Sequence, residues 1–333
     1  MINVFLVLDT VNLGGVEIAI SKLSLIYDKV SMYKILEDSI LRNHSYYKLG
    51  RAASYIPMLA SANLEEVGVA ITNMRGEDLY VGDYSKKFTM QSISKVIALI
   101  LGLIDNGEEY VFSRVSTESP NEPFNTIETS PFKLDNPMTN AGAITICSMI
   151  KGKSLSEKIS RILHLTRKLS GNNDIEINQE VYISEKNTGN RNKAIAYLLK
   201  DNKKIEGEVL EVLDLYFMQC SIEVNVVDLS NIAAVIANNG VNPKTKEIIV
   251  SKKIAQLVKA IMVIFGMYNE SGHFLMKVGI PAKSGVGGGI MAVAPNNIGV
   301  GIYSPSLDDN GNSIVGMKIL EDITDMLDLN ILG

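Results

Sequence analysis

Ser92 and Lys95 stand three residues apart at the start of the apolar run 90–103, which is too long for a strand and predicts a buried helix. Positions i and i+3 share one helix face about 5–6 Å apart, so a hydroxyl lies beside an amine. Burial disfavours the ammonium form, and a neutral amine can accept the serine proton. The pattern therefore predicts a serine nucleophile activated by a lysine. The alternative is that Ser92 only caps the helix.

A second motif begins at Lys283-Ser284-Gly285 and continues through Val286 to Gly289, directly before a short apolar run. Penicillin-recognising serine enzymes combine S-x-x-K with a later K-T-G, of which K-S-G is a conservative counterpart. A glycine-rich strand edge lets backbone N–H groups approach a substrate carbonyl and form an oxyanion hole. A ligand-free hairpin or bulge remains the alternative. A phosphate-binding loop is disfavoured, because the lysine precedes the glycines and a strand follows.

The elements around these motifs follow from periodicity and turn residues. Short apolar runs separated by turn residues predict two hairpins, 67–72 with 79–82 and 289–293 with 299–303. Helical periodicity predicts helices at 35–47, 90–103, 141–150, 154–169, 190–199, 207–217, 227–238, 254–265 and 312–327. The fold class is therefore α+β: an antiparallel sheet from both chain ends, flanked by helices, with an inserted all-helical lobe. The site is expected in the cleft between sheet and lobe.

The predicted boundaries divide the chain into an extension and one catalytic domain. Residues 1–34 form the extension, which we expect to be loose, and residues 35–333 form the domain. Its sheet lobe covers about 35–105 and 266–333, and its helical lobe covers about 106–265. Within the latter, the segment 113–136 is rich in Pro, Ser, Thr, Asn and Glu and predicts an irregular loop.

Composition narrows the range of partners. The chain has 333 residues, 46% of them hydrophobic, and a formal charge of -5 without long like-charge runs, so neither nucleic acid nor an anionic membrane is an expected partner. The apolar start, residues 1–8, has no basic flank and is too short to span a bilayer. Cys147 and Cys220 fit buried free thiols, which favours the cytoplasm. With three scattered histidines, a metal site is not expected.

Together with further segments, the two motifs make the sequence resemble the phosphate-independent glutaminases of bacteria, which are related to the catalytic domain of the animal kidney-type enzyme. The resemblance extends from about Ile35 to the C-terminus. It is carried by residues 50–57, 91–95, 136–144, 184–185, 191–192, 216–221, 266–268, 283–289, 304–305 and 308–313. It implies a β-lactamase-like or penicillin-binding-protein-like fold and hydrolysis of L-glutamine to L-glutamate and ammonia through a serine-linked glutamyl acyl-enzyme. The resemblance implies no cofactor. It implies a homodimer or a homotetramer.

The resemblance also implies roles for individual residues. Ser92 is the nucleophile, Lys95 its base, and Tyr216 or Tyr268 relays the proton to departing ammonia. Ser92 and Val286 supply the oxyanion N–H groups. The substrate contacts that the resemblance implies are Tyr55, Gln91, Ser92, Asn140, Glu185, Asn192, Tyr216, Tyr268 and Val286. Glu185 offers the anion that the ammonium of a free amino acid requires. Without the resemblance, these polar residues would be interpreted as structural.

The sequence departs from the family pattern in two places, and two alternative functions remain open. Residues 1–34 have no recognised counterpart, and Phe265 stands where relatives tend to have a small residue, which could shift Tyr268. One rival is a penicillin-binding or β-lactamase-type acyl transferase, against which the absence of an export signal argues. The other is a non-catalytic binding module or scaffold, which would require the loss of a catalytic residue, and none is missing.

Overall fold

The computed structural model describes residues 9–13, 16–20, 29–118, 135–296 and 298–333. Strands β1 (Asp9–Leu13) and β2 (Val16–Ile20) pair antiparallel as a separate hairpin. Helix α1 (Lys29–Asn43) begins earlier than the predicted helix 35–47, and its last predicted residues lie in a short 3-10 segment, His44–Leu49. The predicted extension therefore contains a hairpin and the first turns of a helix. Most of the predicted loop 113–136 lies outside the described residues.

The central sheet has five antiparallel strands in the order β4-β3-β9-β8-β7. Strands β3 (Gly68–Thr72) and β4 (Asp78–Gly82) come from the N-terminal half, whereas β7 (Ala282–Ser284), β8 (Gly289–Ala294) and β9 (Ile298–Tyr303) come from the C-terminal end. Both predicted hairpins are confirmed, and so is the prediction that the two chain ends build one sheet. A separate antiparallel pair joins β5 (Phe88–Thr89), which shortly precedes α2 in the sequence, to β6 (Glu223–Val224).

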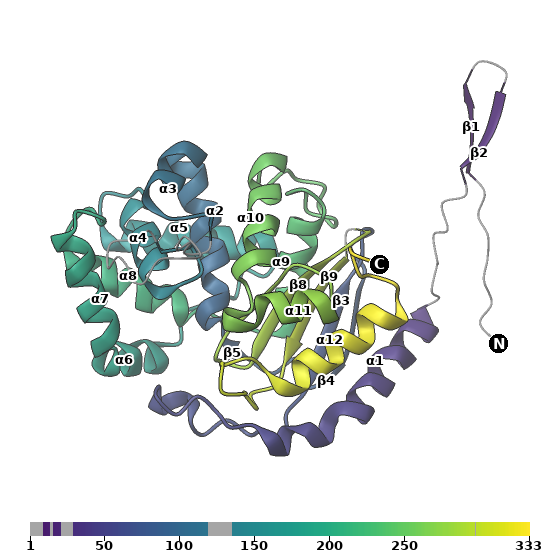
Figure 1. The fold of residues 1–333 in the computed structure, drawn as a ribbon, viewed down its shortest axis with the longest axis horizontal. Coiled ribbons are helices and arrows are strands. Elements are labelled where there is room, and N and C mark those ends of the chain that lie inside the picture. Colours follow the sequence, from purple (N-terminus) through teal and green to yellow (C-terminus); the bar gives the residue numbers. More distant parts are fainter. Residues whose placement is uncertain (1–8, 14–15, 21–28, 119–134, 297) are drawn as a thin grey trace, which may run out of the picture.

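The helices cover the sheet and form a group beside it (Figure 1). Their bounds are α2 (Ser94–Asn106), α3 (Glu108–Arg114), α4 (Asn140–Met149), α5 (Leu155–Ser170), α6 (Gln179–Thr188), α7 (Asn190–Asp201), α8 (Val209–Cys220), α9 (Val226–Ala237), α10 (Lys252–Phe265), α11 (Ser271–Lys277) and α12 (Ile314–Met326). Seven of the nine predicted helices agree closely with α2, α4, α5, α7, α8, α9 and α10, and the last two agree with α1 and α12 in position. The helices α3, α6 and α11 were not predicted.

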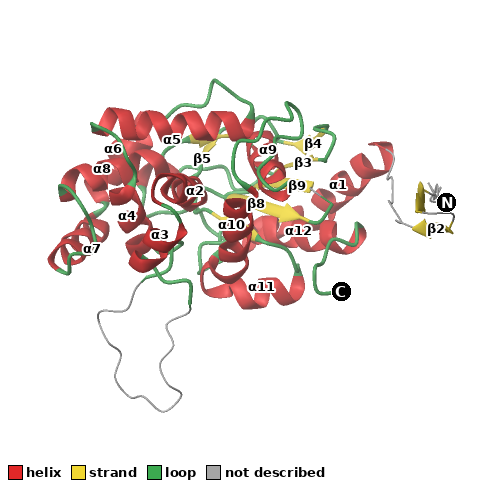
Figure 2. Cartoon of the chain, turned by 90° about the horizontal axis from the view of Figure 1, so that it is seen from above, coloured by secondary structure: helices red, strands yellow, loops and turns green. Residues whose placement is uncertain are grey.

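The sheet lies between two helical layers, with α9 on one face and α12 on the other (Figure 2). The alternation of side chains along β3 explains this arrangement, because Val69 and Ile71 pack in the core with α1 and α12, whereas Ala70 packs in the core with α9. In β9, a Cβ at Gly301 would lie 2.1 Å from the backbone oxygen of Val226. Glycine at this position therefore lets α9 approach the strand closely.

Helix α2 is the buried axis of the helical group. Its residues from Ser94 to Leu103 are all buried, and it contacts α4, α5, α8 and α10. Because α2 also follows directly on the strand β5, its first turn lies where the helical group meets the sheet. The two chemically informative motifs are therefore placed at this junction.

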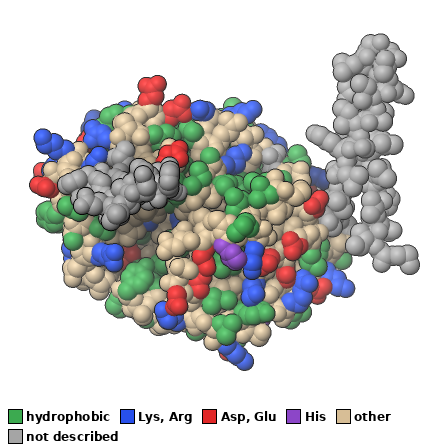
Figure 3. Space-filling view, in the orientation of Figure 1, with side chains coloured by type: hydrophobic (Ala, Val, Ile, Leu, Met, Phe, Trp, Pro, Cys, Tyr) green, Lys and Arg blue, Asp and Glu red, His purple; other side chains and the backbone are tan. Residues whose placement is uncertain are grey.

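On the face seen in Figure 3, acidic and basic side chains are interspersed. None of the helices among the described residues combines the length and the apolar character needed to cross a bilayer. The same residues contain no group of three or more His, Cys, Asp or Glu side chains arranged for a metal ion.

Candidate active site

Ser92 and Lys95 lie at the N-terminal end of α2, on either side of its first residue. Residues Gln91–Ile93 form a 3-10 turn that continues into α2, so the two residues lie on consecutive helical turns as their spacing predicted. Ser92 is half-buried, whereas Lys95 is 1% exposed. Burial lowers the pKa of Lys95 to about 8. An amine with this pKa is partly neutral near neutral pH and can act as a base.

The Lys95 amine is held from the side of α4. Its Nζ donates to the backbone oxygen of Met138 at 3.0 Å and to Asn140 Oδ1 at 2.7 Å. Asn140 Nδ2 in turn donates to Asn192 Oδ1 at 2.9 Å. Two predicted site residues from α4 and α7 are therefore connected to the lysine. The amine makes these two bonds and none to Ser92 among the described residues.

The glycine-rich segment approaches the backbone of the serine turn. A Cβ at Gly285 would lie 2.4 Å from the backbone oxygen of Met90 and 3.4 Å from the backbone nitrogen of Ser92. At Gly287, a Cβ would lie 2.4 Å from the backbone oxygen of Thr89. No side chain fits at either position, so the glycines allow this contact. Val286, between them, is thereby held beside the segment 89–92, which lies nearly two hundred residues earlier in the sequence.

Tyr268 lies on the sheet side of the serine. Its hydroxyl is buried, and burial raises its pKa to about 12, opposed by interactions with the hydroxyls of Ser92 and Ser284. The hydroxyl makes no hydrogen bond of good geometry among the described residues. Tyr268 and Gln91 both have positive φ, +51° and +49°, which is unusual for residues other than glycine. Such conformations concentrate at functional sites, where the surrounding structure holds them in place.

Glu185, from α6, is the buried carboxyl group of the site. It is 9% exposed, and its Oε2 has no hydrogen-bond partner among the described residues. Burial raises the pKa of Glu185 to about 8, and the positive charge of Lys95 opposes the shift. The pKa values of Tyr55 and Tyr216 are raised mainly by burial and further by the charge of Glu185. Tyr55, Tyr216 and Lys95 therefore lie close enough to Glu185 to interact with it electrostatically, although Tyr55 is 65% exposed overall.

The two tyrosines predicted for proton relay have different surroundings. Tyr216 is fully enclosed on α8, and its hydroxyl interacts with the thiol of Cys220. Tyr268 interacts with Ser92 instead. Gln91, the remaining predicted contact, is 2% exposed, and its Nε2 donates to Thr89 Oγ1 at 3.2 Å.

Sequence reasoning assigned no catalytic or binding role to four side chains beside this cluster. Ser284 Oγ donates to Asn312 Oδ1 at 2.6 Å, and Asn312 Nδ2 donates to Glu270 Oε2 at 2.8 Å. Cys220, interpreted only as a buried thiol, accepts a long contact of 4.0 Å from Ser94 Oγ. Ser284 and Asn312 both occur in segments that carry the family resemblance, and this resemblance is the sequence signal that could have identified them.

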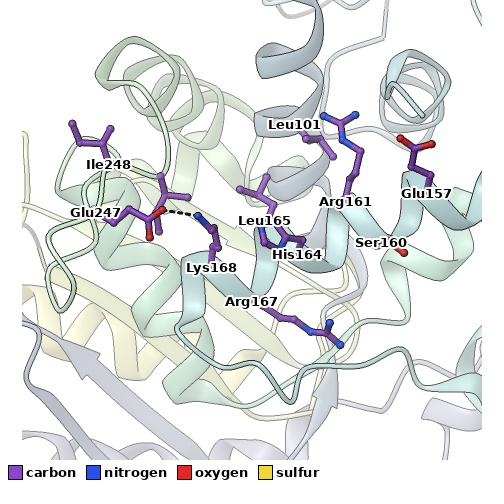
Figure 4. A pocket seen from close by; sticks show the side chains of 11 residues that line it. Leu101, Glu157, Ser160, Arg161, His164, Leu165, Arg167, Lys168, Glu247 and Ile248 are labelled. Atoms are coloured by element: carbon purple, nitrogen blue, oxygen red, sulfur yellow. Dashed lines mark hydrogen bonds and ion pairs between the residues drawn. The ribbon is translucent and has the colours of Figure 1, made fainter. Parts of the chain in front are cut away.

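A cavity of about 550 Å³ lies elsewhere, along α5 (Figure 4). Its lining contains none of the predicted site residues. Lys168 pairs with Glu247 at 2.5 Å, and Arg161 pairs with Asp105 outside the lining. Two cations of its lining, Lys168 and Arg161, are therefore paired with carboxylates within the protein.

Comparison with known proteins agrees with this geometry. A family model described as glutaminase matches residues 50–332. Glutaminase 2 of Clostridium perfringens is 51% identical over 304 residues, covering 90% of this chain and all of the relative. A glutaminase of Clostridium botulinum strain Hall is 49% identical with the same coverage.

Solved structures give the same result. A probable Bacillus subtilis glutaminase complexed with 6-diazo-5-oxo-L-norleucine is 37% identical, with a TM-score of 0.83, over 92% of this chain and 97% of that one. A covalent complex between a Bacillus subtilis glutaminase and 5-oxo-L-norleucine, formed with the same compound, has a TM-score of 0.84 at 37% identity over 90% of this chain and 99% of that one. These matches confirm the predicted fold class.

Proposed function

The chain belongs to the glutaminase family, and we propose that it hydrolyses L-glutamine through a γ-glutamyl ester on Ser92. It is an amidohydrolase acting on glutamine, which decides against the penicillin-binding alternative. The observation that carries the covalent route is the contact between the serine turn and the glycine-rich edge, with the buried Lys95 one turn further along α2.

Acylation begins with proton transfer from Ser92 to Lys95. A neutral amine has two hydrogens and one lone pair, and its hydrogens already have the acceptors Met138 and Asn140. The lone pair is therefore left to accept the serine proton. Ser92 Oγ then attacks the amide carbon of glutamine, and the N–H groups of Ser92 and Val286 stabilise the oxyanion that forms.

Breakdown of the tetrahedral intermediate requires a proton on the departing nitrogen. We assign this transfer to Tyr268, because its hydroxyl interacts with Ser92, whereas that of Tyr216 interacts with Cys220. As Tyr268 gives its proton to the nitrogen, it takes up the proton that Lys95 received from Ser92, so the C–N bond breaks and both side chains are neutral again. Ammonia leaves, and water attacks the ester with the same groups acting in reverse. Glutamate and free Ser92 result.

Recognition of the amino acid part falls to Glu185 and its neighbours. The ammonium of glutamine supplies the partner that Glu185 Oε2 lacks. Tyr55, Gln91, Asn140 and Asn192 are neutral groups that complete the contacts.

The test of the covalent route uses Ser92→Ala with Ser94→Ala as the matched control. Ammonia release from glutamine should fall at least about 10³-fold in the Ser92 variant. Intact-mass analysis after treatment with 6-diazo-5-oxo-L-norleucine should show an adduct on the wild type and the control but none on Ser92→Ala. Full activity or an adduct in that variant would refute the serine ester.

Assembly and location remain parts of the same proposal. We propose a homodimer or homotetramer, which light scattering of the purified chain would show. We also propose the cytoplasm, supported by two cysteines that are both buried and free. Domain assignment follows the sequence interpretation, with one catalytic domain over 35–333.

A further inference from the structure

Lys283, the first residue of the K-S-G segment, is fully buried although its side chain ends in an amine. Its Nζ donates to the backbone oxygens of Gly266 at 2.9 Å and Ser284 at 2.7 Å, and it lies 4.2 Å from the centroid of the Tyr268 ring. The three N–H groups of an ammonium thus have two carbonyls and one aromatic face as partners. The catalytic route above does not use this side chain.

All of these partners surround the turn that carries Tyr268. Gly266 precedes the tyrosine by two residues, and the backbone nitrogen of Ser284 also donates to Gly266 at 3.3 Å. The strand β7 is therefore connected to the turn by its backbone and by Lys283. Tyr268 has a φ of +51°, an unfavourable backbone conformation that persists only when neighbouring groups hold it.

We propose that Lys283 is a positioning residue for Tyr268: it holds the ring so that the tyrosine hydroxyl stays beside Ser92 while ammonia leaves. The inference rests on the proposed role of Tyr268 as the proton relay. Burial and the positive charge of Lys95 lower the pKa of Lys283. Its two backbone hydrogen bonds need only two hydrogens, so they form in either protonation state.

A double-mutant cycle with Lys283→Met and Tyr268→Phe tests this role. Methionine keeps the apolar stem and removes the amine, and phenylalanine keeps the ring and removes the hydroxyl. Lys283→Met should lower kcat by about 30-fold with KM changed less than about 3-fold, because small displacements of a reacting group have large effects on rate. In the Tyr268→Phe background the same change should lower kcat less than about 3-fold, since no hydroxyl remains to be positioned. An equal loss in both backgrounds would overturn the proposal.

Thermal unfolding of all four proteins separates positioning from general stability. Loss of the amine should lower Tm equally in both backgrounds, because the Gly266 and Ser284 carbonyls lose their partner in each. If Lys283→Met does not fold, Lys283→Gln, which retains an amide donor, replaces it in the cycle with the same criterion. Unchanged kcat in Tyr268→Phe alone would refute the relay itself. A slowed Tyr268→Phe enzyme with additive Lys283 effects would refute only the positioning role.

Discussion

Glu185 is expected to be needed for substrate binding and, at the same time, to be costly for folding. Its pKa is about 8 in the folded chain and 4.5 for an ordinary glutamate, because burial disfavours the charge. The folded state therefore keeps a proton that the unfolded state releases as pH rises above 4.5. The stability contributed by this residue falls with pH up to about 8 and is constant beyond it.

The substitution Glu185→Gln removes this pH dependence while nearly preserving shape. Each pH unit between the two pKa values corresponds to about 1.4 kcal/mol, so the effect of the substitution on the free energy of unfolding should become more favourable by about 4 kcal/mol between pH 5 and pH 8. Burial of the new amide adds a cost of about 1–3 kcal/mol that is the same at every pH. The net change at pH 8 should therefore be stabilising by roughly 1–3 kcal/mol.

Urea denaturation of both proteins at several pH values measures this difference directly. Glu180→Gln, at an exposed position of the same helix, controls for the loss of one carboxylate. KM of Glu185→Gln for glutamine should rise about 10–100-fold, because a charged partner of the substrate ammonium is lost. A stability difference that stays constant from pH 5 to pH 8 would refute the assigned burial cost. An unchanged KM would refute the ammonium contact.

Three further outcomes follow from the site. Since the pKa of Lys95 is lowered to about 8, its neutral form grows as pH rises, and kcat/KM should increase through about pH 8; a flat profile from pH 6 to 9 would contradict lysine as the base. Asn140→Asp places an anion 2.7 Å from the amine and so raises the pKa of Lys95. The increase of kcat/KM with pH should therefore move to a pH about one unit higher. Gly285→Ala should lower kcat at least about 10-fold because its Cβ would meet the Met90 oxygen at 2.4 Å, whereas Gly272→Ala, which meets nothing within 4 Å, should retain activity; equal activities would refute the close approach.

The sequence predicted elements whose apolar pattern is strong and missed those whose pattern is weak. Helices such as α2 and α9 bury long apolar stretches, so their existence follows from periodicity. Helix α6 is polar on most sides and buries only Val181 and Glu185, so it lacks the apolar stripe of a core helix. Strand β7 has three residues and its pairing depends on β8. Such elements are determined by tertiary contacts that one sequence does not display.

For the site, spacing predicted the serine and lysine pair, whereas the distant partners came from the resemblance. Spacing alone fixes distances only within one helix, so it could place Lys95 beside Ser92 but not Asn140 beside Lys95. The positive φ of Gln91 and Tyr268 had no sequence signal at all, because both residues ordinarily avoid that region. The structure supplies these features through packing.

Rigid apolar packing around the site keeps the pKa values of its buried ionisable groups shifted. Lys95, Glu185 and Lys283 are all buried, and burial moves the pKa of each towards its neutral form. A flexible surrounding would admit water and restore ordinary pKa values, so the shifts require rigid walls. The first turn of α2 provides one wall, because the residues that follow Lys95 are enclosed by α4, α5, α8 and α10. A cavity-forming substitution such as Ile97→Ala should therefore raise the pKa of Lys95 towards that of a hydrated lysine as well as lower stability.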